Sequence, residues 1–405
     1  MFKRFLRVIS AGLVLLTFIS VSLAYANTQR SVVIIDDIGR KVRVNLPVQR
    51  IVSIAPSATE IVFALGAQNL LVGRTDFCNY PKGVSKIPSI GGAVNPSPER
   101  IIASRPQLIL TTRMFSKAMA EPLMRAYPLV VLEPQNVEGV LKNILNVGKA
   151  IDRVKESREL VASLNAFRRP IRSYFKDAKN KPTVLVLVWH DPLITVGPGS
   201  FIASVVEEGG GLNYIRKDIG AYPIVSPEAL LHEEPDIILY PTKSMGIDPS
   251  FLRESPFKHL KAVKEGRVFP FDDDLLFRPG PRVIQGMLEV SKAIDPVLKK
   301  SRIFSLSTLE GKLYQDNLLV LPRVSLKNLR GRFHVTREAI EVLLNGYLKE
   351  LKIIGSSTQI TFKDGRFLTV SMVEGLLPLR RILEFMDFKL FWDNEFKEVH
   401  IFSKP

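Results

Sequence analysis

Short apolar runs alternate along the chain with segments whose apolar residues recur at helical spacing. The runs at residues 50–55 and 183–188 have the continuous apolar character of strands that are buried on both faces of a parallel sheet. Ser57, with Glu60 three residues later, predicts a capped helix start directly after the first run. Residues 31–35 and 41–44, separated by a turn, predict a β-hairpin. The pattern therefore predicts an α/β protein.

One pattern occurs twice without a gap, at residues 97–110 and at residues 226–239. In both copies a Ser-Pro-Glu triplet is followed by a second Pro and then by an apolar run that ends in Ile-Leu. The triplet predicts a helix start with Ser as its cap and Pro in the first turn, and the apolar run predicts a strand. We therefore expect two similar Rossmann-like lobes, one around each copy.

Residues 137–178 lie between the two copies and have helical spacing nearly throughout. We expect one helix that packs on the first lobe and a longer helix that crosses to the second lobe. Pro170 lies inside the second helix and is predicted to bend it or to end a segment there.

The pattern changes again after residue 300. Strand-like runs at residues 318–321 and 359–362, with a helix expected over 336–348, predict a small α+β domain. The predicted organisation is a signal peptide at 1–26, an N-terminal α/β lobe at 27–136, a helical connection at 137–178, a C-terminal α/β lobe at 179–300 and an accessory α+β domain at 301–405.

The first residues have the composition of a secretory signal peptide. Three basic residues precede an apolar run at 8–23, and Ala24-Tyr25-Ala26 provides a cleavage site. An uncleaved membrane anchor is the alternative, although the run is short for a span. No cysteine lies near Ala26, so we expect an unanchored periplasmic protein and not a lipoprotein. Cys78 has no partner for a disulfide and is expected to be a small buried hydrophobe.

The formal net charge of +16 is spread along the chain instead of being gathered in one arm. Together with export, this distribution argues against nucleic acid as a partner and favours anionic small molecules or envelope surfaces. The sequence contains no phosphate loop, no nucleophile elbow and no zinc-protease motif, and its five histidines lack metal-ligand spacing. We expect no enzyme, no catalytic residue and no metal site; an exported hydrolase using His190 or His232 is the enzymatic alternative.

Ligands of α/β proteins bind outside the C-terminal ends of the strands. Side chains expected at those ends combine flat aromatic surfaces with few charges, which suits a large and partly apolar ligand. Each side chain alone is also explained by packing or capping. The candidate ligand-binding residues are Ser57, Thr59, Phe77, Tyr80, Asn95, Met114, Trp189, His190, Tyr222, Asp274 and Arg278.

Glu99 and Glu228 occupy the same position in the two copies of the repeated pattern. An acidic residue in the first turn stabilises a helix, so either glutamate alone is explained by local structure. Their repetition at equivalent places in two lobes favours a second hypothesis, in which two exposed carboxylates dock to basic sockets on a partner.

Residues 50 to about 295 resemble the periplasmic binding proteins that deliver vitamin B12, haem and iron siderophores to ABC importers. The resemblance rests on residues 50–60, Tyr80-Pro81, 97–101, 105–109 and 226–228. It implies two α/β lobes joined by a long interdomain helix, a ligand in the cleft between them, and docking of Glu99 and Glu228 to arginines of the permease. It also implies a cargo that is a cobalt or iron chelate, namely cobalamin or another corrinoid, a ferric siderophore or haem, and no resident cofactor.

Four residues match cleft positions of the B12-binding members: Phe77, Tyr222, Asp274 and Arg278. Ala93 stands where those members have a tryptophan, which weakens the case for cobalamin itself.

The tail from about residue 318 to 402 resembles, more weakly, the small domain named after the N-terminal region of copper amine oxidases. The matching segments are 377–381, 392–393 and 399–401, and they contain no copper-binding cluster. We interpret residues 301–405 as an accessory module that contacts a cell-envelope component. The alternative to transport is an envelope structural or adhesion protein that works through this tail.

Overall fold

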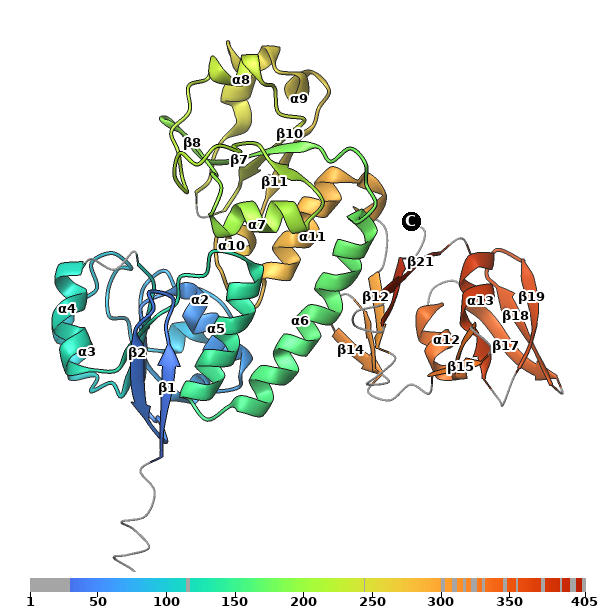
Figure 1. The fold of residues 1–405 in the computed structure, drawn as a ribbon, viewed down its shortest axis with the longest axis horizontal. Helices are drawn as coiled ribbons and strands as arrows, with labels where there is room; N and C mark the ends of the chain where they lie inside the picture. Colours follow the sequence, from blue (N-terminus) through green and yellow to red (C-terminus); the bar gives the residue numbers. More distant parts are fainter. Residues whose placement is uncertain are drawn as a thin grey trace, which may run out of the picture. The chain divides into compact units, whose positions relative to one another are not determined.

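The computed structural model describes residues 30–113, 117–243 and 245–299 of the chain (Figure 1). In the tail it describes residues 303–307, 312–315, 318–321, 326–329, 332–344, 348–354, 356–372, 376–386, 388–393 and 398–402. The chain divides into two compact units. Unit 1 holds residues 1–132 and 146–155, and unit 2 holds residues 133–145 and 156–405. The predicted signal peptide and Met114 lie outside the described residues, and the predicted five-part division stays a prediction.

Unit 1 is built on a parallel sheet with the strand order β4-β3-β5-β6. Its strands are β3 (Ile51–Ser53), β4 (Leu71–Arg74), β5 (Leu108–Thr111) and β6 (Leu129–Val131), and its helices include α2 (Pro56–Ala64), α3 (Pro98–Ala103) and α4 (Lys117–Ala126). Val52, Ile109 and Leu129 are buried in its core. The continuous apolar runs of the sequence thus form strands that are covered on both faces.

Helix α2 begins two residues earlier than the capping pattern predicted. Ala55 is its N-cap and makes no side-chain cap, and Pro56 takes the first helical position. The predicted capping box at Ser57 is therefore wrong, because the proline fixes the first turn and leaves Ser57 buried inside it. The helix ends before Gly66, whose φ of 67° is one that side chains rarely adopt.

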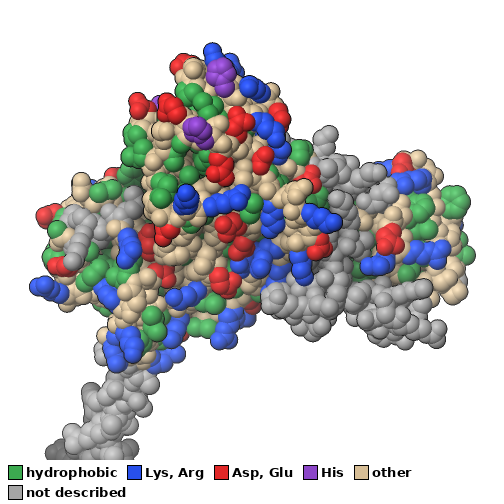
Figure 2. All heavy atoms as spheres, turned by 45° about the horizontal axis from the view of Figure 1, so that its top comes forward, with side chains coloured by type: hydrophobic (Ala, Val, Ile, Leu, Met, Phe, Trp, Pro, Cys, Tyr) green, Lys and Arg blue, Asp and Glu red, His purple; other side chains and the backbone are tan. Residues whose placement is uncertain are grey.

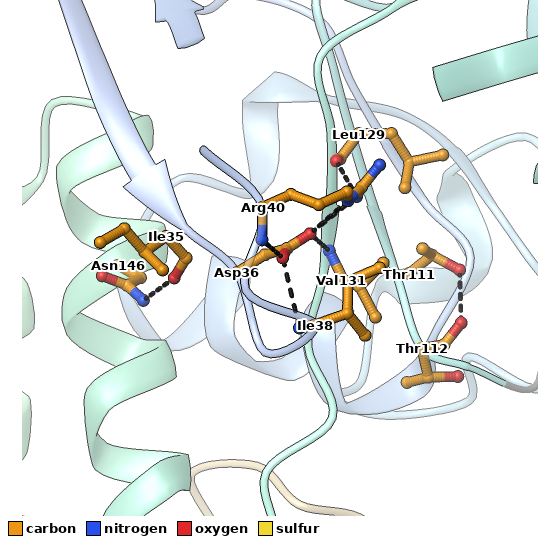
Figure 3. Close-up of polar contacts among 9 residues, drawn as sticks. All are labelled: Ile35, Asp36, Ile38, Arg40, Thr111, Thr112, Leu129, Val131 and Asn146. Carbon is orange, nitrogen blue, oxygen red and sulfur yellow. Dashed lines mark hydrogen bonds and ion pairs between the residues drawn. The ribbon is translucent and has the colours of Figure 1, made fainter. Parts of the chain in front are cut away.

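The predicted hairpin is present as β1 (Ser31–Ile35) and β2 (Lys41–Asn45), which pair antiparallel. Its turn is organised by buried Asp36, which accepts hydrogen bonds from the backbone N–H groups of Ile38 and Arg40 and from the Arg40 guanidinium (Figure 3). The carboxylate also accepts from the backbone N–H of Val131, and Asp37 N–H donates to the Val131 carbonyl at 3.1 Å. The tip of the hairpin is thereby fixed to β6.

Unit 2 contains a second sheet, with the order β11-β10-β7-β8 and β9 beside β7. The strands are β7 (Thr183–His190), β8 (Leu193–Thr195), β9 (Leu212–Asn213), β10 (Ile237–Pro241) and β11 (Val268–Phe271). Strand β10 is parallel to β7 and to β11, whereas β8 is antiparallel to β7. Strand β11 coincides with the short apolar run Val268-Phe269-Pro270-Phe271.

The two repeated segments adopt the same local structure. The Ser97 hydroxyl accepts a hydrogen bond from Arg100 N–H, and the Ser226 hydroxyl accepts one from Ala229 N–H. Strands β5 and β10 begin at the same position of their copies. The helices differ, because α3 spans Pro98–Ala103 whereas α8 is a single turn, Ala229–His232.

Two helices form the connection, α5 (Val137–Ala150) and α6 (Val154–Phe175). Helix α6 does not end at Pro170, as the sequence allowed, but continues through it. The neighbouring Arg168 is buried and bonds to Glu138 in α5 and to Glu208 in α7 (Phe201–Glu208). These contacts hold the helix across the position where the proline removes a backbone hydrogen bond.

The described part of the tail consists of three antiparallel sheets and two helices, α12 (Arg337–Leu343) and α13 (Leu379–Phe385). The sheets contain β12 (Ile303–Ser307), β13 (Lys312–Gln315), β14 (Leu318–Leu321), β15 (Leu326–Leu329), β16 (Arg332–Val335), β17 (Leu348–Ile354), β18 (Ser357–Phe362), β19 (Phe367–Ser371), β20 (Leu377–Pro378), β21 (Lys389–Asp393) and β22 (Glu398–Phe402). The helix that was predicted to reach residue 348 ends at Leu343, and strand β17 begins at Leu348. Within the described part of the chain, no helix has the length and apolarity to cross a membrane.

Candidate functional site

In unit 1, the candidate aromatic residues lie on the loop that follows β4. Phe77 and Tyr80 are 60% and 44% exposed, which is high for large apolar side chains. Asn95 is also exposed, on the second loop, and Val94 beside it is half exposed. The backbone bond from Asp76 N–H to the Gly91 carbonyl, 2.9 Å, joins the two loops. The structure therefore brings these candidate residues to one end of the sheet.

The loop that follows β4 is anchored in the interior of unit 1 by Cys78, which is buried as predicted. Its sulfur lies 3.1 Å from the Thr59 hydroxyl and 3.3 Å from the Thr75 hydroxyl. Thr59 also donates to the Ser53 hydroxyl and is fully buried. Thr59 thus supports the loop from inside instead of facing solvent, and Ser57 is buried as well. The sequence did not reveal that Cys78 anchors the loop that carries Phe77.

In unit 2, Trp189 and His190 lie at the C-terminal end of β7. Their rings are 5.2 Å apart, and His190 lies 5.6 Å from the ring of Phe251. The Trp189 indole N–H donates to the Asp191 carbonyl at 2.8 Å, which fixes the ring, whereas His190 is exposed. Phe251, in the 3-10 helix Pro249–Arg253, was not found from the sequence, because no local pattern links it to β7.

Tyr222 lies on a second loop of unit 2 and is 53% exposed. Ile219 and Ile224 on the same loop are exposed too, so the ring belongs to a small apolar surface that sequence reasoning missed. Partial burial, together with the negative charge of Glu133, raises the pKa of Tyr222. The phenol therefore stays protonated at neutral pH and can donate a hydrogen bond.

Asp274 and Arg278 form an ion pair of 2.7 Å in which both side chains are largely buried. They lie in and just after α10 (Asp273–Leu276). The preceding Asp273 accepts hydrogen bonds from the backbone N–H groups of Lys243 and Met245, which fixes this segment to the end of β10. The two candidate polar residues are therefore brought together, and they neutralise one another.

Glu99 and Glu228 are both exposed. The Ser97 hydroxyl donates to a Glu99 carboxylate oxygen at 2.7 Å, and this bond, with one from the backbone, lowers the pKa of Glu99. Glu228 is the N-cap residue of α8 and its side chain makes no cap hydrogen bond. The first carboxylate is thus held in one orientation, and the second is less constrained. Among the described residues no cluster of His, Cys, Asp and Glu could hold a metal ion.

The sequence profile of the periplasmic binding protein family matches residues 51–275. The ABC transporter substrate-binding lipoprotein YvrC of Bacillus subtilis is 29% identical over 286 residues, which cover 68% of this chain and 89% of the relative. The vitamin B12-binding protein of Vibrio parahaemolyticus is 23% identical over 63% of this chain and 93% of its own length.

Among solved structures, the periplasmic haem-binding protein RhuT of Roseiflexus is similar in fold, with a TM-score of 0.56 and 24% identity. The likeness covers 62% of this chain and 99% of that structure. It confirms the predicted two-lobed α/β fold. The resemblance of the tail to a copper amine oxidase domain stays a prediction.

The predicted localisation is corrected by these comparisons. The prediction of an unanchored periplasmic protein, released by cleavage after Ala26, is contradicted because the Bacillus subtilis relative is a lipoprotein. The prediction depended on the absence of a cysteine beside one predicted cleavage site. Residues 1–29 lie outside the described residues, so the fold carries no support for it.

Proposed function

Because the chain belongs to the periplasmic binding protein family, we propose that it is the solute-binding component of an ABC importer and that it carries a metal chelate. The cargo classes are a corrinoid such as cobalamin, a haem and a ferric siderophore. The Vibrio relative binds vitamin B12, and the Roseiflexus protein of the same fold binds haem. These two similar proteins support the cargo class without selecting one member of it.

The observation that carries the proposal is the placement of exposed aromatic rings at strand ends in both units. Phe77 and Tyr80 are exposed on the loop after β4, and exposed His190 lies beside partly buried Trp189 at the C-terminal end of β7. Flat rings bury large apolar area at little entropic cost and suit the planar or aromatic faces of such chelates. The neutralised pair of Asp274 and Arg278 offers polar contacts without net charge.

The proposed mechanism requires no covalent chemistry. The aromatic surfaces bind the cargo, and the exposed carboxylates of Glu99 and Glu228 dock the protein to basic side chains of the permease. Ser97 supports this role for Glu99, because its hydrogen bond keeps the carboxylate ionised and oriented. No comparison supports the alternative of an adhesion protein, and contact of the tail with an envelope component stays a prediction.

The experiment is a titration of the purified protein with cyanocobalamin, haemin and a ferric siderophore, followed by absorption spectra and native mass spectrometry. We expect tight binding of one of the three, with a single cargo per chain. Phe77→Ala and Trp189→Ala should each weaken it, whereas Phe367→Ala, which removes an exposed aromatic ring of the tail, should not. Failure of all three cargoes to bind would refute the proposal.

A further inference from the structure

One face of the hairpin formed by β1 and β2 is exposed and combines aliphatic with basic side chains. In the antiparallel register Val33 lies opposite Arg43, and Ile35 lies opposite Lys41. Val33 and Ile35 are 41% and 53% exposed, and Lys41 and Arg43 are exposed as well. We call these four residues the hairpin face. Because cross-strand neighbours lie about 5 Å apart, they form one continuous surface.

The hairpin face is held rigidly. Ile34 and Val44, on the opposite side of the two strands, are buried in unit 1. In helix α5, Asn146 and Lys149 donate to two backbone carbonyls of β1, at 3.3 and 3.1 Å. These carbonyls are therefore not open to a further strand, so the outer edge of β1 is poorly suited to binding an extended peptide by strand addition.

Two acidic residues beside the hairpin are already engaged by basic ones. Asp36 is buried and paired with Arg40, and Asp152 pairs with Arg30 at 2.8 Å. Lys41 and Arg43 consequently present positive charge to an outside partner. Figure 2 shows basic side chains, with hydrophobic ones beside them, around the start of the described chain.

The position of the hairpin in the chain indicates the partner. Arg30 is the first described residue, and β1 begins directly after it. The residues before it include a basic start and an apolar run at 8–23, a composition that directs a chain to a membrane. The hairpin face thus lies, in sequence, directly after the segment that directs the chain to a membrane.

We propose that the hairpin face rests on a bilayer that contains anionic phospholipids. Lys41 and Arg43 contact lipid phosphates, and Val33 and Ile35 reach the apolar boundary beneath the headgroups. Basic side chains gain energy near anionic lipid, and aliphatic side chains gain it by leaving water. This contact would orient the protein on the membrane, and it is independent of the cargo.

The test uses the chain from Arg30 to Pro405, which holds every described residue, and vesicles of phosphatidylcholine with or without phosphatidylglycerol. We expect co-sedimentation with the mixed vesicles only, and weaker binding as salt rises. Each basic residue near such a surface contributes about five-fold in partition, so Lys41→Gln with Arg43→Gln should weaken binding about thirty-fold. Val33→Ser with Ile35→Ser should weaken it as well.

The matched control is Lys258→Gln with Lys264→Gln, which removes the same charge from two exposed lysines of unit 2. It should leave vesicle binding almost unchanged. An equal loss in the control would mean general attraction by the net charge and would overturn the proposal, as would unchanged binding in the hairpin variants. If the hairpin variants lost uptake in cells but still bound vesicles, the proposal would be overturned, and the hairpin face would be assigned to a protein partner. The cargo titrations test the proposed transport function separately, because the hairpin face is not among the candidate ligand-binding residues.

Discussion

Gln107 and Asp236 make the same contact in two different sheets. The Gln107 side-chain oxygen accepts hydrogen bonds from the backbone N–H groups of Gln49 and Arg50, just before β3. The Asp236 carboxylate accepts from the backbone N–H and the hydroxyl of Thr183, at the start of β7. Both residues follow the second proline of their repeated segment, so each sets the register between its own strand and the neighbouring one.

We expect Gln107→Ala and Asp236→Ala each to lower the free energy of unfolding by about 1–2 kcal/mol, because backbone groups at a strand start lose their partner. Urea unfolding followed by circular dichroism measures both. Gln68→Ala, a change at an exposed position of unit 1, serves as a neutral control. A loss no larger than in this control would mean that the strand register is fixed elsewhere.

The pH dependence of the free energy of unfolding should distinguish the contact made by Asp236 from the one made by Gln107. Burial opposes ionisation of Asp236, but hydrogen bonds from Thr183 and the nearby Lys261 and Arg267 outweigh it and lower its pKa below the usual 3.8. A lowered folded-state pKa gives stability that is present above the unfolded value and is lost as the pH falls through the folded one. The difference between the wild type and Asp236→Asn should therefore shrink in acid, whereas that of Gln107→Ala should not. Parallel pH profiles would contradict this.

Ser97→Ala should raise the pKa of Glu99 towards its ordinary value, because the hydroxyl that lowers it is removed. The same change removes the cap of α3 and should cost about 1 kcal/mol of stability. A carboxyl titration by NMR measures the pKa. Ser226→Ala, the equivalent change at α8, should leave the Glu99 titration where it is; a shift in both variants would indicate a general effect.

Charge reversal of both glutamates tests the proposed docking. Glu99→Lys with Glu228→Lys should abolish uptake in cells while the affinity for cargo stays unchanged, because both carboxylates are exposed and neither is a candidate ligand-binding residue. Glu159→Lys with Glu265→Lys makes an equal charge change at exposed positions and should preserve uptake. Normal transport by the first double variant would exclude the docking role.

Local patterns predicted most strands because a buried strand is encoded by its own apolar run. The hairpin lies where its sequence pattern predicted it, and the repeated segments have the same helix-to-strand order. Helix ends were less certain, since Pro56 shifted the start of α2 and tertiary contacts carried α6 through Pro170. Chemistry that depends on distant contacts was not visible in the sequence. Neither the support of the Phe77 loop by Cys78 nor the packing of Phe251 beside His190 has a local signal.

Arg168 provides a test of the helical connection itself. Its guanidinium is buried between Glu138 and Glu208, whose hydrogen bonds and charges outweigh the cost of burial and raise its pKa. Arg168→Ala leaves the partly buried Glu208 without its partner, and removing one member of a buried pair typically costs about 3 kcal/mol or more. We expect a loss of that size in urea unfolding. Arg158→Ala, on an exposed position of the same helix, should cost little. Similar stability in both variants would show that packing of Phe167 and Ile171 alone keeps α6 continuous at Pro170.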